Sequence, residues 1–339
     1  MSDHQNNRFL FYFFYNILLN ILWPDIHLNL TKNIAKALYK LGHTLILPSK
    51  EYIVTNFPPK EFNQWAWNTT WTQEKAALEF QHKNVKVLNK DQILDIKPEI
   101  IFITSFESQF ETLSEIWPHL KSNSKLACYS GNDYWDGAYP FYIIKNYLCA
   151  DYVGYALANK YKVNHLYYKP WVDYDRCTFD GPTDGNIIGI YISEYEKNFN
   201  QEYNMSKSLQ QMTPYIDYHY HTESSQEQLT KSLKSSIATQ HIKHLEGYGI
   251  AVIESMACGK PVFMHRKMAQ NKSLMNWSIE NVTTLFFESE YEYIAKLKAL
   301  YQSKDYRYFI QYTTASAIRQ IINNDKETEK LGHFLNNLV

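Results

Sequence analysis

Residues 244–264, HLEGYGIAVIESMACGKPVFM, constrain the fold of this chain more than any other stretch. Between Ile250 and Cys258 the apolar residues recur at three- and four-residue spacing, which predicts a helix with one buried face. Gly259 stands where a helix C-terminal cap favours a positive φ angle, and Pro261 ends the helix before the apolar run Val262 to Met264. The sequence therefore predicts a loop, a helix, a cap and a strand.

The loop before this helix has the composition of a ligand-binding turn. Gly247 and Gly249 flank Tyr248, and glycines let the backbone approach a ligand closely. The helix start that follows offers unpaired N–H groups to an anion. Glu254 is expected one turn inside the helix, on its more polar side, where a carboxylate can accept hydrogen bonds from sugar hydroxyls. An ordinary buried α/β helix with a capping glycine is the alternative interpretation.

The stretch resembles the donor-site signature of the group 1 nucleotide-sugar glycosyltransferases, which are retaining enzymes of the GT-B fold. Their pattern is Glu, seven residues, Glu, with Gly-aromatic-Gly after the first Glu and Gly-Lys-Pro-Val after the second; here the glutamates are Glu246 and Glu254. The resemblance implies that Glu246 lies at the transferred sugar and that Glu254 holds the ribose. It also implies that Gly247, Tyr248, Gly249 and Ile250 face the diphosphate.

Three further positions are compared with the same family. Lys197 stands where the family has a phosphate-binding lysine, but the place of its arginine is taken by Ile192, so Lys197 is either a phosphate ligand or a solvated loop residue. Lys243 stands where the family usually has Ser, and a cation beside a diphosphate is chemically sensible. Asp133 follows a predicted strand end, where α/β sheets place ligand contacts. It is a candidate catalytic residue by position, or a plain turn residue.

The sequence offers no convincing metal site. Asp173 and Asp175 form a D-x-D pair, which metal-dependent glycosyltransferases of another fold use, but no further ligand accompanies it. His241 and His244 likewise lack partners with clear spacing. We therefore expect neither a metal nor a cofactor, and only a nucleotide-sugar co-substrate.

The length of 339 residues and 45% apolar content suit two domains. A strand at Arg8–Tyr15, a helix at Ile26–Leu41 and a strand at His43–Leu47 form a βαβ unit. We read Ala150–Leu157 as the last strand region of the first domain. A Lys169 to Phe179 segment resembles the interdomain connection of the family.

The resemblance implies the GT-B fold, with two Rossmann-like doubly wound parallel-sheet domains facing across a cleft. The expected units are an acceptor domain at 1–180, a nucleotide-sugar donor domain at 186–310, and terminal helices at 311–339 that pack back toward the first domain.

Charge and hydropathy limit the partners. The net charge of −1 argues against nucleic acid, and four scattered cysteines favour a reduced cytoplasmic location. Phe9 to Trp23 is apolar, but it is fifteen residues long and is interrupted by Asn16 and Asn20. It is too short for a spanning helix, so we expect a buried strand and leave a peripheral membrane contact open.

The expected activity is retaining transfer of a sugar from a nucleoside-diphosphate sugar, UDP rather than GDP, to a glycan, a lipid-linked molecule or another hydroxyl acceptor. Two alternatives remain. A non-catalytic nucleotide-sugar-binding protein of the same fold would explain the loss of the family's arginine at Ile192. A phage-type DNA-modifying glycosyltransferase would need a basic acceptor cleft, which the balanced charge does not indicate.

Overall fold

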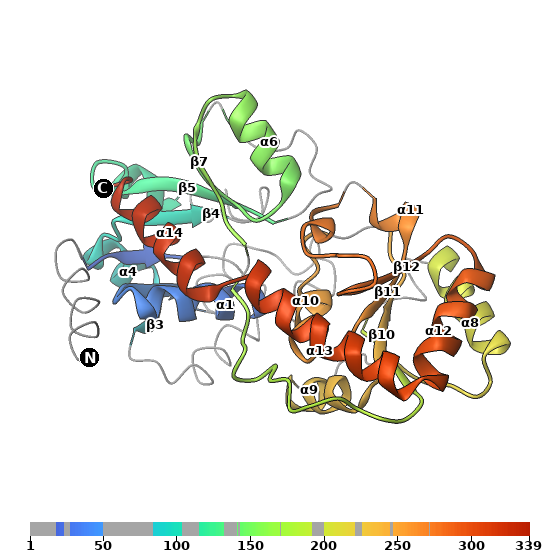
Figure 1. Cartoon of the computed structure of the whole chain (residues 1–339). Helices are drawn as coiled ribbons and strands as arrows, with labels where there is room; N and C mark the ends of the chain where they lie inside the picture. The colour runs from blue at the N-terminus through green and yellow to red at the C-terminus, as the bar shows by residue number, and fades with distance from the viewer. Residues whose placement is uncertain are drawn as a thin grey trace, which may run out of the picture.

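The computed structural model describes residues 18–23, 28–49, 84–103, 115–131, 141, 143–169, 171–191, 200–220, 226–244, 247–270 and 272–339. Two parallel β-sheets organise these residues, one in each half of the chain (Figure 1). Among the described helices, none is long and apolar enough to cross a membrane.

The first domain contains a seven-stranded sheet of order β3-β2-β1-β4-β5-β6-β7, in which every pairing is parallel. Its strands are β1 Asn20–Leu22, β2 Thr44–Pro48, β3 Val85–Leu88, β4 Ile100–Ile103, β5 Lys125–Ser130, β6 Asn146–Cys149 and β7 Asn164–Tyr167. The central strand β4 is apolar and buried throughout, as expected when helices cover both faces of a sheet. The strand order reverses between β1 and β4, and ligands of open α/β sheets bind outside such a reversal.

The described helices of the first domain are α1 Leu28–Lys40, α4 Lys90–Ile96, α6 Tyr152–Lys160 and a helical segment at 115–120. The predicted strand at Ala150–Leu157 is wrong. The Asp151 side chain accepts a hydrogen bond from the Gly154 N–H and caps α6, so the apolar residues that follow pack as a helix. The predicted strand at Arg8–Tyr15 lies outside the described residues, and β1 lies nearer the helix that follows.

The second domain contains a five-stranded parallel sheet of order β12-β11-β10-β8-β9. Its strands are β8 Ile187–Ile190, β9 Asp217–Tyr220, β10 Ala238–His241, β11 Val262–His265 and β12 Thr284–Phe287. Its helices are α8 Asn200–Met212, α9 Gln226–Ser235, α10 Ile250–Ala257, α11 Arg266–Ala269, the 3-10 turn η2 Ser273–Asn276, and α12 Glu290–Gln302. The two parallel-sheet α/β domains agree with the predicted fold class.

The last two helices return the chain from the second domain to the first. In Figure 1, α13 Lys304–Ile321 and α14 Asn324–Asn336 form one diagonal path, drawn in red, between the two lobes. Helix α13 packs on α10 and α12, whereas α14 packs on α1 and β7. The predicted boundary between 310 and 311 falls within α13. The domain boundaries themselves stay predictions.

The largest buried hydrophobic cluster is continuous across both domains. It joins residues of the first sheet, such as Trp23 and Tyr129, to Met256 of α10 and Val262 of β11. Burial of apolar surface therefore fixes how α10 meets the first domain.

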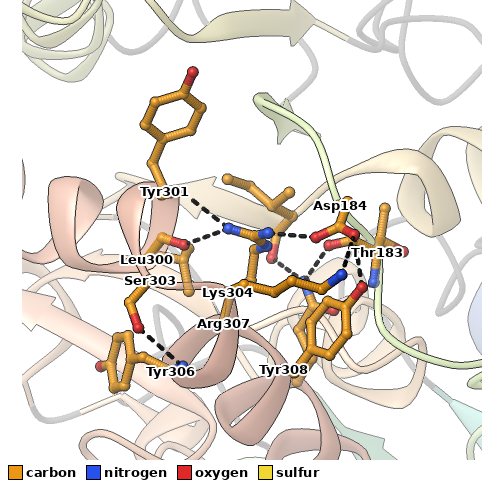
Figure 2. Close-up of polar contacts among 11 residues, drawn as sticks. Thr183, Asp184, Leu300, Tyr301, Ser303, Lys304, Tyr306, Arg307 and Tyr308 are labelled. Carbon is orange, nitrogen blue, oxygen red and sulfur yellow. Dashed lines mark hydrogen bonds and ion pairs between the residues drawn. The ribbon is translucent and has the colours of Figure 1, made fainter.

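Arg307 anchors the segment that leads into the second domain. Its Nη1 donates to the carbonyl oxygens of Leu300 at 3.1 Å and Tyr301 at 2.9 Å, which end α12, and its Nη2 pairs with Asp184 (Figure 2). Tyr308 Oη donates to the other carboxylate oxygen of Asp184 at 2.6 Å. One buried guanidinium thus joins the connection between the domains to the start of α13.

Candidate functional site

The predicted loop, helix, cap and strand are all present in the second domain. Gly249 is the N-cap of α10, with φ 66° and ψ 70°, and its carbonyl oxygen accepts a hydrogen bond from the Ile253 N–H at 3.1 Å. No side chain caps this helix start. The first N–H groups of a helix have no partner within the helix, so the start of α10 is suited to an anion.

Tyr248 links this loop to the first domain. Its side chain is buried, and a Cβ atom added at Gly131 would lie 3.0 Å from the Tyr248 ring and 3.1 Å from the Tyr129 ring. Gly131 directly follows β5, at the carboxyl edge of the first sheet. The loop before α10 therefore contacts the edge of the first sheet at which α/β proteins bind ligands.

Glu254 lies on α10 at a small pocket shared by three parts of the chain. Its carboxylate is largely buried, and the pocket is lined by Asn33 of α1, by residues 171–173 of the connection between the domains, and by Ile250 and Ile253 of α10. A site at Glu254 is thus built from both domains.

Arg176 forms an ion pair with Glu254. Its Nη2 pairs with Glu254 Oε1, and its Nη1 donates to Thr230 Oγ1 at 2.9 Å. Burial alone would lower the pKa of Arg176, but the carboxylates of Glu254 and Asp173 raise it. The guanidinium therefore remains charged and holds Glu254 from the side of the interdomain connection.

Asp173 is held between two cations. Lys36 Nζ of α1 lies 2.6 Å from Asp173 Oδ2, and Arg176 Nε lies 3.7 Å from the same oxygen. Burial raises the pKa of Asp173, but the hydrogen bond and charge of Lys36, together with Arg176, outweigh it and leave the pKa below its usual value. Asp173 thus acts as an ion-pair partner in the structure, and Asp175 is exposed.

The described part of the chain contains no group of three His, Cys, Asp or Glu residues that could hold a metal ion. Of the two histidines weighed from the sequence, His244 contacts the buried carboxylate of Glu202 on α8. His244 thus has a carboxylate partner within the protein.

The structure places six of the nine candidate residues. Gly247, Tyr248, Gly249, Ile250 and Glu254 lie together at the start of α10, and half-buried Lys243 follows shortly after β10. Glu246, Asp133 and Lys197 lie outside the described residues, and the roles of all nine residues stay predictions.

Two other positions of the signature have structural roles. A Cβ at Gly259, where φ is 74°, would meet the ring of Phe179 and would lie 3.1 Å from the Gln311 carbonyl oxygen. The buried Lys260 donates to Thr183 Oγ1 at 2.5 Å, and burial lowers its pKa to about 8. These residues secure the interdomain connection against the C-terminal end of α10.

Sequence reasoning missed Arg176 and Lys36. Arg176 follows Asp173 by three residues, within the segment already compared with the family, and that proximity was the only available signal. Nothing in the sequence around Lys36 connects it to a segment so distant along the chain.

The two parallel-sheet α/β domains match the GT-B fold of solved glycosyltransferases. Residues 187–316, which cover the second sheet, match the family described as glycosyl transferases group 1. The second domain is thus a group 1 glycosyltransferase domain, and the chain is a glycosyltransferase with the GT-B fold. No curated protein sequence matches the chain.

Solved structures support the fold over nearly the whole length. The HepE protein of Anabaena, in complex with UDP, is 8% identical with a TM-score of 0.61, covering 95% of this chain and 100% of that chain. A glycosyltransferase from Rickettsia africae is 13% identical with a TM-score of 0.61, covering 96% and 99%. Sucrose-phosphate synthase from Thermosynechococcus elongatus is 9% identical with a TM-score of 0.57, covering 94% and 98%. At such low identities these likenesses establish the fold alone.

Proposed function

We propose that this glycosyltransferase moves a sugar from a nucleoside-diphosphate sugar to a hydroxyl acceptor, with retention of the anomeric configuration. One observation carries the proposal: Gly249, in a left-handed conformation, opens α10 toward the loop, and Glu254 lies one turn further along, where α10 meets α1 and the interdomain connection. This arrangement offers N–H groups to a diphosphate and a carboxylate to the adjoining sugar hydroxyls.

The leaving nucleoside diphosphate gains negative charge as the glycosidic bond breaks. The first N–H groups of α10 and its helix dipole would stabilise that charge, as would Lys243 and Lys197 if they reach the phosphates. Glu246 would orient the transferred sugar and support its cation-like ring, and Asp133 would face the sugar or the acceptor. This chemistry requires neither a metal nor a cofactor.

Glu254 would bind the ribose of the nucleotide. The Glu254 carboxylate already accepts a hydrogen bond from Arg176. Hydroxyl contacts to this ionised carboxylate would be charge-assisted and hence stronger than neutral ones.

We favour a UDP-sugar as donor over a GDP-sugar. The structure of the Anabaena protein, which has the same fold, was solved in complex with UDP. So was a structure of Staphylococcus aureus TarM, which is 12% identical with a TM-score of 0.55. The acceptor would bind mainly to the first domain and would be a glycan, a lipid-linked molecule or another hydroxyl compound. A cytoplasmic location with peripheral membrane contact is part of the same proposal.

A non-catalytic nucleotide-sugar-binding protein is the second candidate, because Ile192 replaces the phosphate-binding arginine of the family. It would bind the nucleotide and turn over no donor.

Calorimetry with UDP and GDP tests the donor site. The Glu254→Gln variant should bind UDP more weakly by about 1–3 kcal/mol, because a charged hydrogen-bond partner is neutralised. The matched Glu246→Gln variant should keep nearly the same UDP affinity and lose turnover. An equal loss of UDP affinity in the two variants would contradict these roles.

A further inference from the structure

Four alternating charges form a row across the junction of the domains. Lys36 lies on α1, Asp173 and Arg176 on the interdomain connection, and Glu254 on α10. Their side chains are 19%, 9%, 18% and 12% exposed, respectively. Because the row is largely shielded from water, its ion pairs are screened less than surface pairs.

Arg176 is held on several sides. Its backbone N–H donates to Asp173 Oδ1 at 3.3 Å, and one arm of its guanidinium donates to Thr230 Oγ1 of α9 at 2.9 Å. The other arm pairs with Glu254 Oε1. Since a guanidinium is planar and its donors are fixed relative to one another, holding one arm sets the direction of the other.

The orientation of the Glu254 carboxylate therefore depends on Arg176. A glutamate side chain loses rotamer freedom when it binds a ligand, and a carboxylate that is already oriented avoids much of that loss. The pocket beside Glu254 is lined by the same connection that carries Arg176. The ion row and the predicted ribose site thus share one carboxylate.

We propose that Arg176 is a positioning residue that presents Glu254 to the ribose hydroxyls of the nucleotide. Asp173 and Lys36 hold Arg176 in place. Lys36, a residue of the first domain, therefore takes part in binding of the ribose by the second domain. This inference rests on the proposed function, because it requires that Glu254 binds the ribose.

A purely structural role for Arg176 makes a different prediction. If the guanidinium only stabilises the junction, its loss lowers the affinity for every nucleotide by the same factor. If it positions Glu254, its loss lowers the affinity for a nucleotide with ribose hydroxyls and has little effect on the affinity for one that lacks them. The ratio of the two affinities separates these roles.

The experiment is calorimetry of the full chain with UDP and with 2′,3′-dideoxy-UDP. The wild-type protein should bind UDP roughly tenfold or more tightly than the dideoxy compound, as expected for hydrogen bonds to a charged group. In Arg176→Gln this ratio should fall to about two. The control is Arg319→Gln, which should keep the wild-type ratio. Arg319 lies on α13, and its guanidinium is 4.4 Å from the ring centroid of Tyr174, a residue of the interdomain connection.

Arg176→Lys keeps a cation and guards against a failure of the Gln variant to fold. A lysine cannot bridge Thr230 and Glu254 with a fixed planar group, so its ratio should lie between those of the wild type and Arg176→Gln. An unchanged ratio in the folded Arg176 variants, or an equal fall in Arg319→Gln, would overturn the proposal. Wild-type binding of UDP without discrimination against the dideoxy compound would also overturn it. Absence of any UDP binding would instead refute the proposed function on which it rests.

Discussion

Two glycines border α10, and replacing each by alanine separates binding from stability. Gly249 begins the helix with φ 66°, and Gly259 follows its end with φ 74°. An alanine at either position adopts a left-handed conformation that costs about 1–2 kcal/mol. The backbone strain is therefore the same, and the surroundings of the added Cβ atom decide the rest.

At Gly259 the Cβ would press against the ring of Phe179, which itself packs edge-on against Tyr312 at 5.1 Å between ring centroids. Overpacking of this kind adds about 1–3 kcal/mol, so Gly259→Ala should destabilise the protein by about 2–5 kcal/mol in total. At Gly249 the Cβ would intrude at the proposed diphosphate site. Backbone strain in Gly249→Ala should cost about 1–2 kcal/mol of stability, and the variant should lose detectable donor turnover.

Urea unfolding and donor hydrolysis measured on the same samples test this pair. Turnover is divided by the folded fraction, so that stability and activity are scored separately. Gly259→Ala should then show near-normal specific activity despite its loss of stability. Near-normal specific activity of Gly249→Ala would refute the role of the loop as a phosphate site.

Three further perturbations test the account. Burial lowers the pKa of His43 from 6.5 to about 4, and the Leu19 N–H faces its Nδ1 at 3.5 Å, so the folded protein resists a proton that the unfolded chain accepts. The contribution of His43 to the free energy of unfolding should be complete above pH 6.5 and should be lost as the pH drops toward 4, by about 2 kcal/mol between pH 7 and pH 5. In His43→Gln, urea unfolding should show no such loss. Arg307→Gln should destabilise the protein by about 2–4 kcal/mol in the same assay, because two α12 carbonyls lose a donor and Asp184 keeps only Tyr308 and Lys304 of its three partners among the described residues. Lys304→Gln, at the exposed end of the same group of residues, should change stability by less than about 1 kcal/mol. UDP affinity measured by calorimetry should be the same with and without a chelator, and binding that vanishes on chelation would restore a metal role for Asp173.

The sequence predicts local features of this fold better than its long-range contacts. The helix at Ile250–Ala257 was predictable because its apolar spacing and its cap at Gly259 are both encoded within one short stretch. Ala150–Leu157 was misread because a short apolar run suits a strand and a helix equally, and the Asp151 cap decides between them.

The candidate site was predictable only in part, for the same reason. The loop and Glu254 follow from one contiguous motif, whereas Arg176 reaches Glu254 across 78 positions of the chain. Such a pairing arises when the two domains and their connection pack together. Neither apolar periodicity nor a helix cap in the sequence predicts the pairing of Arg176 with Glu254.

The central claim is that this chain transfers sugar from a nucleotide donor. The most direct test incubates the protein with a panel of UDP- and GDP-sugars in the presence of chelator and measures the released nucleoside diphosphate. The account predicts release of UDP from at least one UDP-sugar, and a large loss of that release in Glu246→Gln. A protein that binds UDP and releases no nucleoside diphosphate from any donor would contradict the transferase and support a binding role.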